Sequence, residues 1–113
     1  MVQFHRSSAA DGAAVLRVVG EVDLSTIEKL KTAVRSCLAD STAIVLDLSE
    51  LEFIDSSGLG AFVQLAKEAA AQGASFALTN VGARTYRLLE ITGLAAVFDV
   101  RKSGQDADDV AST

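Results

Sequence analysis

The chain has 113 residues, half of them hydrophobic, with 10 lysines and arginines against 15 aspartates and glutamates. This length and composition suit one domain with an ordinary hydrophobic core and exclude a disordered chain. The net charge of −5 excludes a general electrostatic attraction to nucleic acid or to an anionic membrane, because both repel an acidic surface.

The single cysteine and the length of the apolar runs indicate where in the cell the protein is expected. Cys37 is the only cysteine, so no disulfide can form within the chain, which is typical of a reducing environment. Residues 1–12 contain no long apolar stretch of the kind found in secretory signals, and no run approaches the roughly 20 residues that span a bilayer. We therefore expect a cytoplasmic protein. Neither Cys37 nor His5 shows metal-ligand spacing, and no phosphate-binding loop occurs, so we expect no metal and no cofactor.

Two strands are predicted at the start of the chain, at residues 2–5 and 15–22. A turn at residues 7–13, which contains Asp11-Gly12, separates them and favours a hairpin. A helix is predicted to start at Ser25, because Ser25 and Glu28 fit the capping box S-x-x-E. The apolar positions that follow recur at helical spacing and should face the core: Ile27, Leu30, Val34 and Leu38.

The middle of the chain continues with a strand and a second helix. Residues 43–48 (AIVLDL) are apolar almost without a break, which is typical of a strand covered on both faces. Residues 49–55 (SELEFID) are predicted as a loop, and a helix follows from about residue 57 to residue 71. Gly73 is placed to end this helix, since glycine adopts the left-handed conformation at low cost.

The last third of the chain predicts a strand at residues 75–79, a helix at 83–92 closed by Gly93, and a strand at 96–100. The order β-β-α-β-α-β-α-β indicates an α/β domain with a largely parallel sheet. We assign residues 1–103 to this single domain. Residues 104–113 form a polar, acidic tail, for which we expect either a short helix or disorder.

Parallel topology has a consequence for the polar residues that follow the strands. Loops that leave the carboxyl ends of parallel strands lie at the same edge of the sheet. Asp23 follows the second predicted strand, and Asp55-Ser56 follow the third. We therefore expect these three side chains to share one edge.

The segment FIDSSGLGAF, residues 53–62, places two serines at the start of the second helix. In isolation, a serine there most often caps the helix by accepting a hydrogen bond from a backbone N–H. A catalytic serine would need a base, yet the only histidine is His5 in the first strand, and the glycine spacing differs from G-x-S-x-G. The third interpretation is a phosphoacceptor, because the free N–H groups and the dipole of a helix start tolerate a phosphate.

Three segments resemble the STAS-domain anti-anti-sigma factors, which are bacterial antagonists of anti-sigma factors. They are VVGEVDLSTIEKL at 18–30, IVLDLSELEFIDSSGLGAFV at 44–63 and LLEITGLAAVFDV at 88–100. The middle segment is the most specific, since an apolar strand followed by D-S-[ST]-G is the hallmark of that family. The resemblance covers about residues 13 to 100 and implies a small mixed, mostly parallel sheet of about five strands, with helices packed mainly on one face.

The resemblance also implies a mechanism without catalysis by this chain. Ser56 matches the phosphorylated position of the family, Ser57 its neighbour and secondary candidate, and Asp23 an acidic position nearby. The implied partner is an anti-sigma factor that is also a GHKL-type, ATP-dependent serine kinase, and a serine phosphatase would remove the phosphate. The edge expected to bind the partner comprises Asp23, Asp55, Ser56, Ser57, Gly58 and Leu59.

Two other functions stay open at this point. The domain could be a scaffold or sensor subunit of a larger stress-signalling assembly, or a stand-alone STAS module that serves a transporter or a lipid-transport system. A scaffold should elute as a large oligomer, whereas we expect an antagonist to be a monomer or a weak dimer. Co-purification of a GHKL-type ATPase would separate the antagonist from the stand-alone module.

Overall fold

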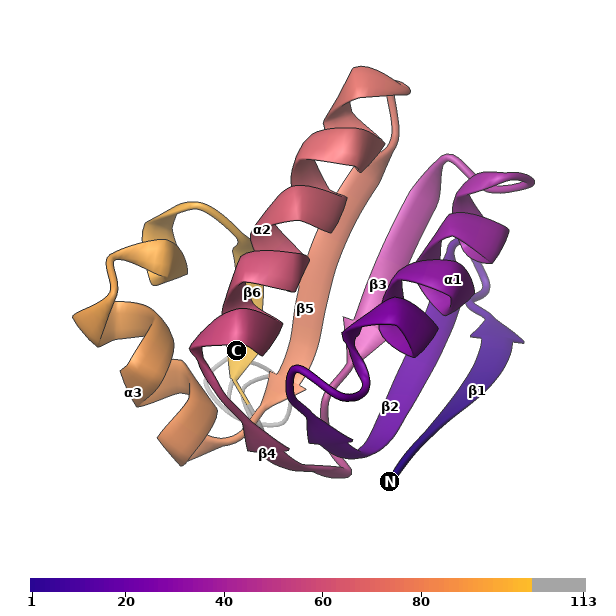
Figure 1. Ribbon diagram of the computed structural model, residues 1–113. Helices are drawn as coiled ribbons and strands as arrows, with labels where there is room; N and C mark the ends of the chain where they lie inside the picture. Colours follow the sequence, from indigo (N-terminus) through magenta and orange to yellow (C-terminus); the bar gives the residue numbers. More distant parts are fainter. Residues whose placement is uncertain (103–113) are drawn as a thin grey trace.

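A computed structural model describes residues 1–102 (Figure 1). The chain begins with an antiparallel hairpin, in which β1 (Val2–Ser8) pairs along its whole length with β2 (Ala14–Val22). In the turn between them, the Asp11 carboxylate accepts a hydrogen bond from the Ala13 N–H at 3.0 Å. The predicted hairpin is therefore confirmed, with a longer first strand than the apolar pattern indicated.

The first helix, α1 (Ile27–Leu38), begins two residues after its predicted start at Ser25. Its N-cap is Thr26, whose buried hydroxyl donates to the Glu21 carbonyl oxygen and accepts from the Asp23 N–H, both at 3.0 Å. The Ser25 hydroxyl instead donates to the Asp23 carboxylate at 2.6 Å. The capping box predicted for Ser25 and Glu28 is therefore wrong, because a tight turn around Asp23 engages the serine first.

Within residues 1–102, the sheet contains six strands in the order β1-β2-β3-β5-β6, with β4 paired to β2 off this path. Every pairing except that of β1 with β2 is parallel. The remaining strands are β3 (Ala43–Asp47), β4 (Leu51–Ile54), β5 (Ser75–Val81) and β6 (Asp99–Lys102). The predicted mixed, mostly parallel sheet is thus confirmed, with one more strand than expected.

Strand β4 lies within the segment that was predicted to be a loop. Its residues Leu51, Phe53 and Ile54 pair with the last part of β2, beyond the stretch that β2 shares with β3. A bulge between Gly20 and Glu21 accompanies this change of partner. Gly20 has φ of +105°, and a Cβ atom there would lie 2.3 Å from the Met1 carbonyl oxygen, so the bulge requires glycine.

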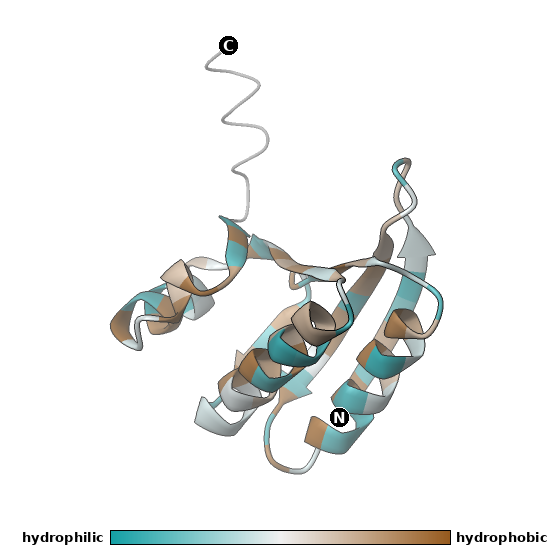
Figure 2. Ribbon diagram, turned by 90° about the horizontal axis from the view of Figure 1, so that it is seen from above, coloured by the Kyte–Doolittle hydropathy of each residue, from teal (hydrophilic) through white to brown (hydrophobic). Residues whose placement is uncertain are grey.

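Two helices, α1 and α2 (Ser56–Ala71), cover one face of the sheet (Figures 1 and 2). They are joined by Arg35, whose guanidinium donates to both carboxylate oxygens of Glu68 at 2.9 and 2.8 Å. The core between helices and sheet contains the largest fully buried side chains: Phe62, Leu30, Ile44, Leu46, Leu65, Leu78, Leu89, Val18, Val22, Val34, Val81 and Cys37. Cys37 is thus a small core residue.

The third helix, α3 (Ala83–Ile91), stands to one side of this layer (Figure 1). Gly73 and Gly93 have φ of +75° and +78°, so both glycines take the left-handed conformation predicted for them after α2 and α3. A 3₁₀ turn, η1 (Leu94–Ala96), follows α3 and delays the last strand to residue 99.

The end of the predicted domain, at residue 103, and the acidic tail at 104–113 lie outside the described residues, so both stay predictions. Among residues 1–102, no helix combines the length and the apolar character needed to cross a membrane.

Candidate functional site

The carboxyl ends of β2 and β4 lie side by side and bring Asp23 and Asp55 to one edge of the sheet. Val22 pairs with Ile54 in the parallel register, and the Asp55 N–H donates to the Val22 carbonyl oxygen at 3.3 Å. The shared edge was expected from parallel topology, but it is β4, rather than β3, that delivers Asp55 to it. We call Asp23, Asp55, Ser56 and Ser57 the switch edge.

The two carboxylates of the switch edge are held in the charged form by hydroxyl donors. The Ser25 hydroxyl lowers the pKa of Asp23, although the nearby charge of Asp55 acts in the opposite direction. The Ser57 hydroxyl, followed by the Gly58 N–H, lowers the pKa of Asp55. At neutral pH the edge therefore carries two negative charges before any modification.

Asp55 caps α2. Its Oδ1 accepts hydrogen bonds from the Gly58 N–H at 3.0 Å and from the Ser57 hydroxyl at 2.5 Å. Of the three interpretations of these serines, the helix cap is wrong, because the helix begins one residue earlier than predicted and the preceding aspartate reaches the free N–H.

The two serines of α2 differ in accessibility and in hydrogen bonding. Ser57 is half-buried and its hydroxyl is engaged by Asp55. Ser56 is exposed, and its hydroxyl makes no hydrogen bond within residues 1–102. It is the first residue of a 16-residue helix, where the dipole and the unpaired N–H groups favour an anion. Of the two hydroxyls, that of Ser56 is the more accessible.

Gly58 and Leu59 support this edge from beneath. A Cβ atom on Gly58 would lie 2.7 Å from a side-chain carbon of Ile54 and 2.9 Å from the Val22 carbonyl oxygen. Leu59 is 3% exposed and belongs to the core. Both residues were predicted to belong to the partner-binding edge, which stays a prediction; in the structure both are buried, and the close approach at Gly58 holds the helix start against β2 and β4.

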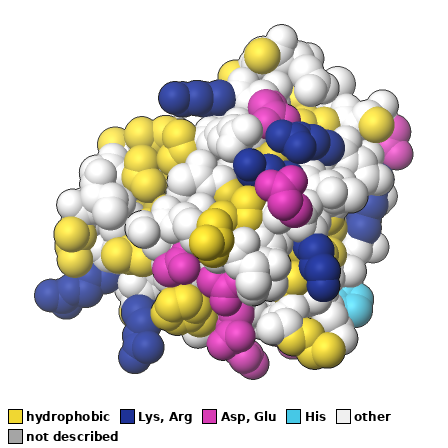
Figure 3. Space-filling model, viewed as in Figure 1, with side chains coloured by type: hydrophobic (Ala, Val, Ile, Leu, Met, Phe, Trp, Pro, Cys, Tyr) yellow, Lys and Arg dark blue, Asp and Glu magenta, His cyan; other side chains and the backbone are white. Residues whose placement is uncertain are grey.

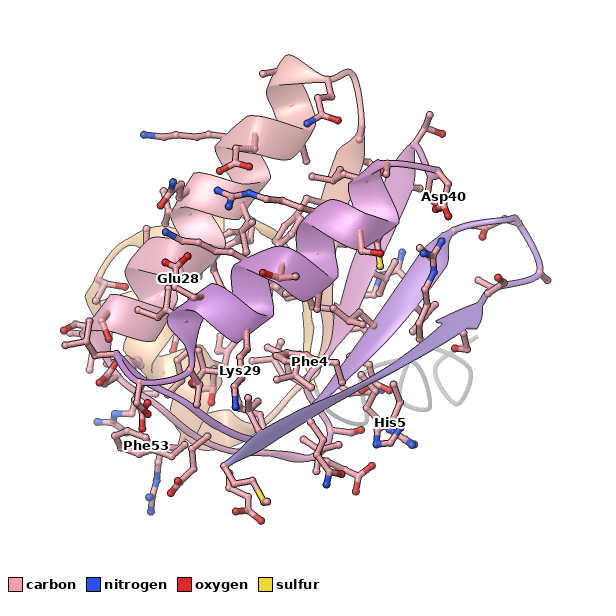
Figure 4. The ribbon with its side chains drawn as sticks, turned by 45° about the vertical axis from the view of Figure 1, so that its right-hand side comes forward. Phe4, His5, Glu28, Lys29, Asp40 and Phe53 are labelled. Carbon is pink, nitrogen blue, oxygen red and sulfur yellow. The ribbon has the colours of Figure 1, made fainter. Side chains whose placement is uncertain are left out.

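The apolar residue that the sequence reasoning assigned to this edge, Leu59, is buried, whereas two apolar residues that it did not single out are exposed. Leu24 directly follows Asp23 and is 80% exposed, and Phe53 on β4 is 49% exposed. Figure 4 shows Phe53 at the opposite end of the molecule from Asp40, which follows the end of α1. A signal for Phe53 was available only once β4 was known to be a strand, because strand alternation then separates Phe53 from the buried Ile54.

Acidification is expected to test the role of Asp55 as the cap. Its folded-state pKa lies below the unfolded value of about 3.9, so the carboxylate stabilises the fold above that pH, and this contribution is lost as the pH falls through the folded pKa. We expect Asp55→Asn, which keeps a capping oxygen, to show a shallower loss of stability below roughly pH 4 than the wild type. Urea midpoints measured across the acid range would check this.

Asp55→Ala is the matched variant, since it removes the cap altogether. It should be less stable than Asp55→Asn at neutral pH, and equal urea midpoints for the two variants would contradict the capping role.

Comparison with known proteins places these features in a family context. A family model described as the STAS domain matches residues 7–107. The anti-sigma-F factor antagonist RsfB of Mycobacterium tuberculosis is 36% identical over 98 residues, covering 86% of this chain and 80% of that protein. The anti-sigma-B factor antagonist of Listeria monocytogenes is 33% identical over 85 residues, covering 74% of this chain and 75% of that protein. A crystal structure of an anti-sigma factor antagonist from Mycobacterium paratuberculosis superposes with a TM-score of 0.81 at 28% identity, covering 100% and 96% of the two chains.

Proposed function

The chain belongs to the STAS domain family, and from this premise we propose that it is an anti-sigma factor antagonist switched by phosphorylation of Ser56. The relatives named as antagonists support the binding of an anti-sigma factor. In this proposal the unphosphorylated switch edge binds an anti-sigma factor that is also a serine kinase, and a sigma factor is released. Phosphorylation of Ser56 breaks the complex, and a serine phosphatase restores it.

The observation that carries the proposal is the contrast between the two serine hydroxyls. A kinase must reach the acceptor oxygen, which attacks the γ-phosphorus of ATP, loses its proton to a base of the kinase and leaves ADP as the product. The Ser56 hydroxyl is exposed and makes no hydrogen bond among the described residues, whereas the Ser57 hydroxyl is held by Asp55. Modification at Ser57 would also remove the donor that lowers the pKa of Asp55.

The electrostatics of the edge explain why a phosphate would disrupt binding. Phosphate adds about −1.5 to −2 charges at neutral pH, next to the carboxylates of Asp23 and Asp55. A negative charge of the partner that lies 4 Å from this phosphate would be repelled by about 4 kcal/mol at an effective dielectric constant near 20. The helix start tolerates the added anion, so the domain stays folded and the cost falls on the complex.

Phosphate transfer tests this proposal directly. Wild type, Ser56→Ala and Ser57→Ala would be incubated with the cognate anti-sigma kinase and ATP, and the added phosphate would be counted by intact-mass spectrometry. We expect one phosphate on the wild type and on Ser57→Ala, and none on Ser56→Ala. Equal incorporation by Ser56→Ala would show that Ser56 is not the acceptor.

A further inference from the structure

A groove lies between α3 and the strand that leads into Ser56. It has a volume of about 530 Å³ and runs along β4, the end of β5 and the inner side of α3. Figure 2 shows α3 projecting from the side of the molecule, and Leu89 is its only buried residue. We call this feature the α3 groove; its large apolar lining residues are Leu48, Leu51, Phe53, Ile54, Leu88 and Ile91.

Two of these large apolar side chains are exposed to solvent. Phe53 is 49% exposed and Ile91 is 73% exposed, and they line the groove from β4 and from the end of α3. Exposed apolar side chains that gather in one hollow, rather than being scattered singly, mark a surface that another molecule covers.

The charge of the α3 groove differs from that of the whole chain. Its charged lining residues are Arg84, Arg87 and Glu52, so cations prevail there although the chain carries a net charge of −5. Both arginines are exposed on α3, and neither forms a salt bridge within residues 1–102. In Figure 3, basic side chains project beside exposed apolar side chains over the region of α3. A segment that combines apolar side chains with carboxylates complements this surface.

The groove is continuous with the switch edge. Strand β4 lines the groove with Phe53 and Ile54, and the next residues are Asp55 and Ser56. Four short polar side chains cannot supply an interface of standard size, which buries about 800 Å² on each partner. Interfaces are held chiefly by aromatic residues, arginines and apolar anchors in pockets, and the α3 groove offers all three next to Ser56.

On the premise of the function proposed above, we propose that the α3 groove is the main docking surface for the anti-sigma partner. It takes a partner segment whose apolar side chains enter between Phe53 and Ile91 and whose carboxylates meet Arg84 and Arg87. Most of the binding free energy then comes from contacts in the α3 groove. Phosphorylation at the switch edge determines whether the complex dissociates.

Affinity measurements with the cognate anti-sigma factor test the apolar part of this proposal. Phe53→Ser and Ile91→Ser are each expected to weaken binding about 30-fold or more. Val97→Ser is the matched control, because Val97 is 60% exposed but does not line the groove, and it should bind like the wild type. Ile91 is so exposed that its variant should fold normally, which a thermal melt of each variant would verify.

Charge reversal tests the basic part. Arg84→Glu combined with Arg87→Glu should slow association about tenfold and reduce its dependence on salt. Lys67→Glu changes the net charge as much as Arg84→Glu alone does, so it is the control for that single reversal; Lys67 is exposed on α2 and does not line the groove.

The outcomes separate this proposal from the function on which it rests. If Ser56→Asp weakens binding but the groove variants bind like the wild type, the docking proposal is wrong and the proposed function stands. If the wild type binds no anti-sigma factor, both are wrong. If light scattering shows a dimer that Ile91→Ser dissociates while partner binding is unchanged, the groove is occupied by a second copy of the chain and the proposal is overturned.

Discussion

Phosphorylation of Ser56 is expected to weaken the complex with the anti-sigma factor by more than about a hundredfold, which corresponds to a loss of about 3 kcal/mol. The phosphate joins an edge where hydroxyl donors already keep Asp23 and Asp55 ionised, so a partner surface that accepts two charges must accept up to four. Ser56→Asp adds only one charge and should weaken binding at least about tenfold. Titration calorimetry with each form would measure these differences.

Two controls distinguish repulsion from damage to the site. Ser56→Ala should bind like the wild type, because the Ser56 hydroxyl makes no hydrogen bond among the described residues. Repulsion at an exposed edge is screened by salt, so the difference between Ser56→Asp and wild type should narrow as the ionic strength rises. A difference that stays constant up to 1 M salt would contradict an electrostatic switch.

Alanine substitutions at the two glycines of α2 are expected to change stability in opposite directions. A Cβ atom at Gly58 would lie 2.9 Å from the Val22 carbonyl oxygen, and backbone cannot yield as a flexible side chain can. We expect Gly58→Ala to cost about 1–3 kcal/mol of unfolding free energy through overpacking. A Cβ atom at Gly60 has nothing within 4 Å, so Gly60→Ala should gain up to about 1 kcal/mol from helix propensity. Urea unfolding of both variants measures the contrast.

The same two variants test whether the position of the start of α2 affects the phosphorylation of Ser56. Because Gly58 holds the start of α2 against β2 and β4, a shifted helix start would displace Ser56 and slow its phosphorylation in Gly58→Ala. Gly60→Ala should accept phosphate at the wild-type rate. Equal stability of the two variants would show that the close approach at Gly58 is not needed by the fold.

Much of the fold followed from local signals. The continuous apolar run at residues 43–48 predicted a strand, and the strand observed is Ala43–Asp47. Gly73 and Gly93 adopt the left-handed conformation that their positions predicted. These predictions succeeded because each depends on residues close together in the chain, where periodicity and glycine conformation act without help from distant partners.

The two incorrect predictions of helix caps share one cause, which is that neighbouring polar side chains compete for the same hydrogen-bond partners. Ser25 matches a capping box, but its hydroxyl donates to Asp23, and Thr26 becomes the N-cap. At the second helix, Asp55 rather than a serine is the N-cap. Serine, threonine and aspartate can all occupy the N-cap position of a helix, so the residue type alone does not decide which of them does.

Strand β4 shows a second limit of prediction from the sequence. Its four residues, Leu51–Ile54, carry too short a pattern to distinguish a strand from a loop. They become a strand because β2 extends past β3 and, after the bulge at Gly20, offers its free edge to a new neighbour. That pairing joins segments about 30 residues apart, and no local propensity encodes it.

By itself, therefore, the sequence determined the order of most strands and helices, the family, and the short list of polar residues at the end of the second strand and the start of the second helix. Only the tertiary structure decided which of the two serine hydroxyls makes no hydrogen bond among residues 1–102, because Asp55 must be in place before Ser57 can be engaged. It also decided that Phe53 and Ile91 lie in one groove. Hydrogen-bond partners and shared surfaces depend on distances between chain segments, which folding alone establishes.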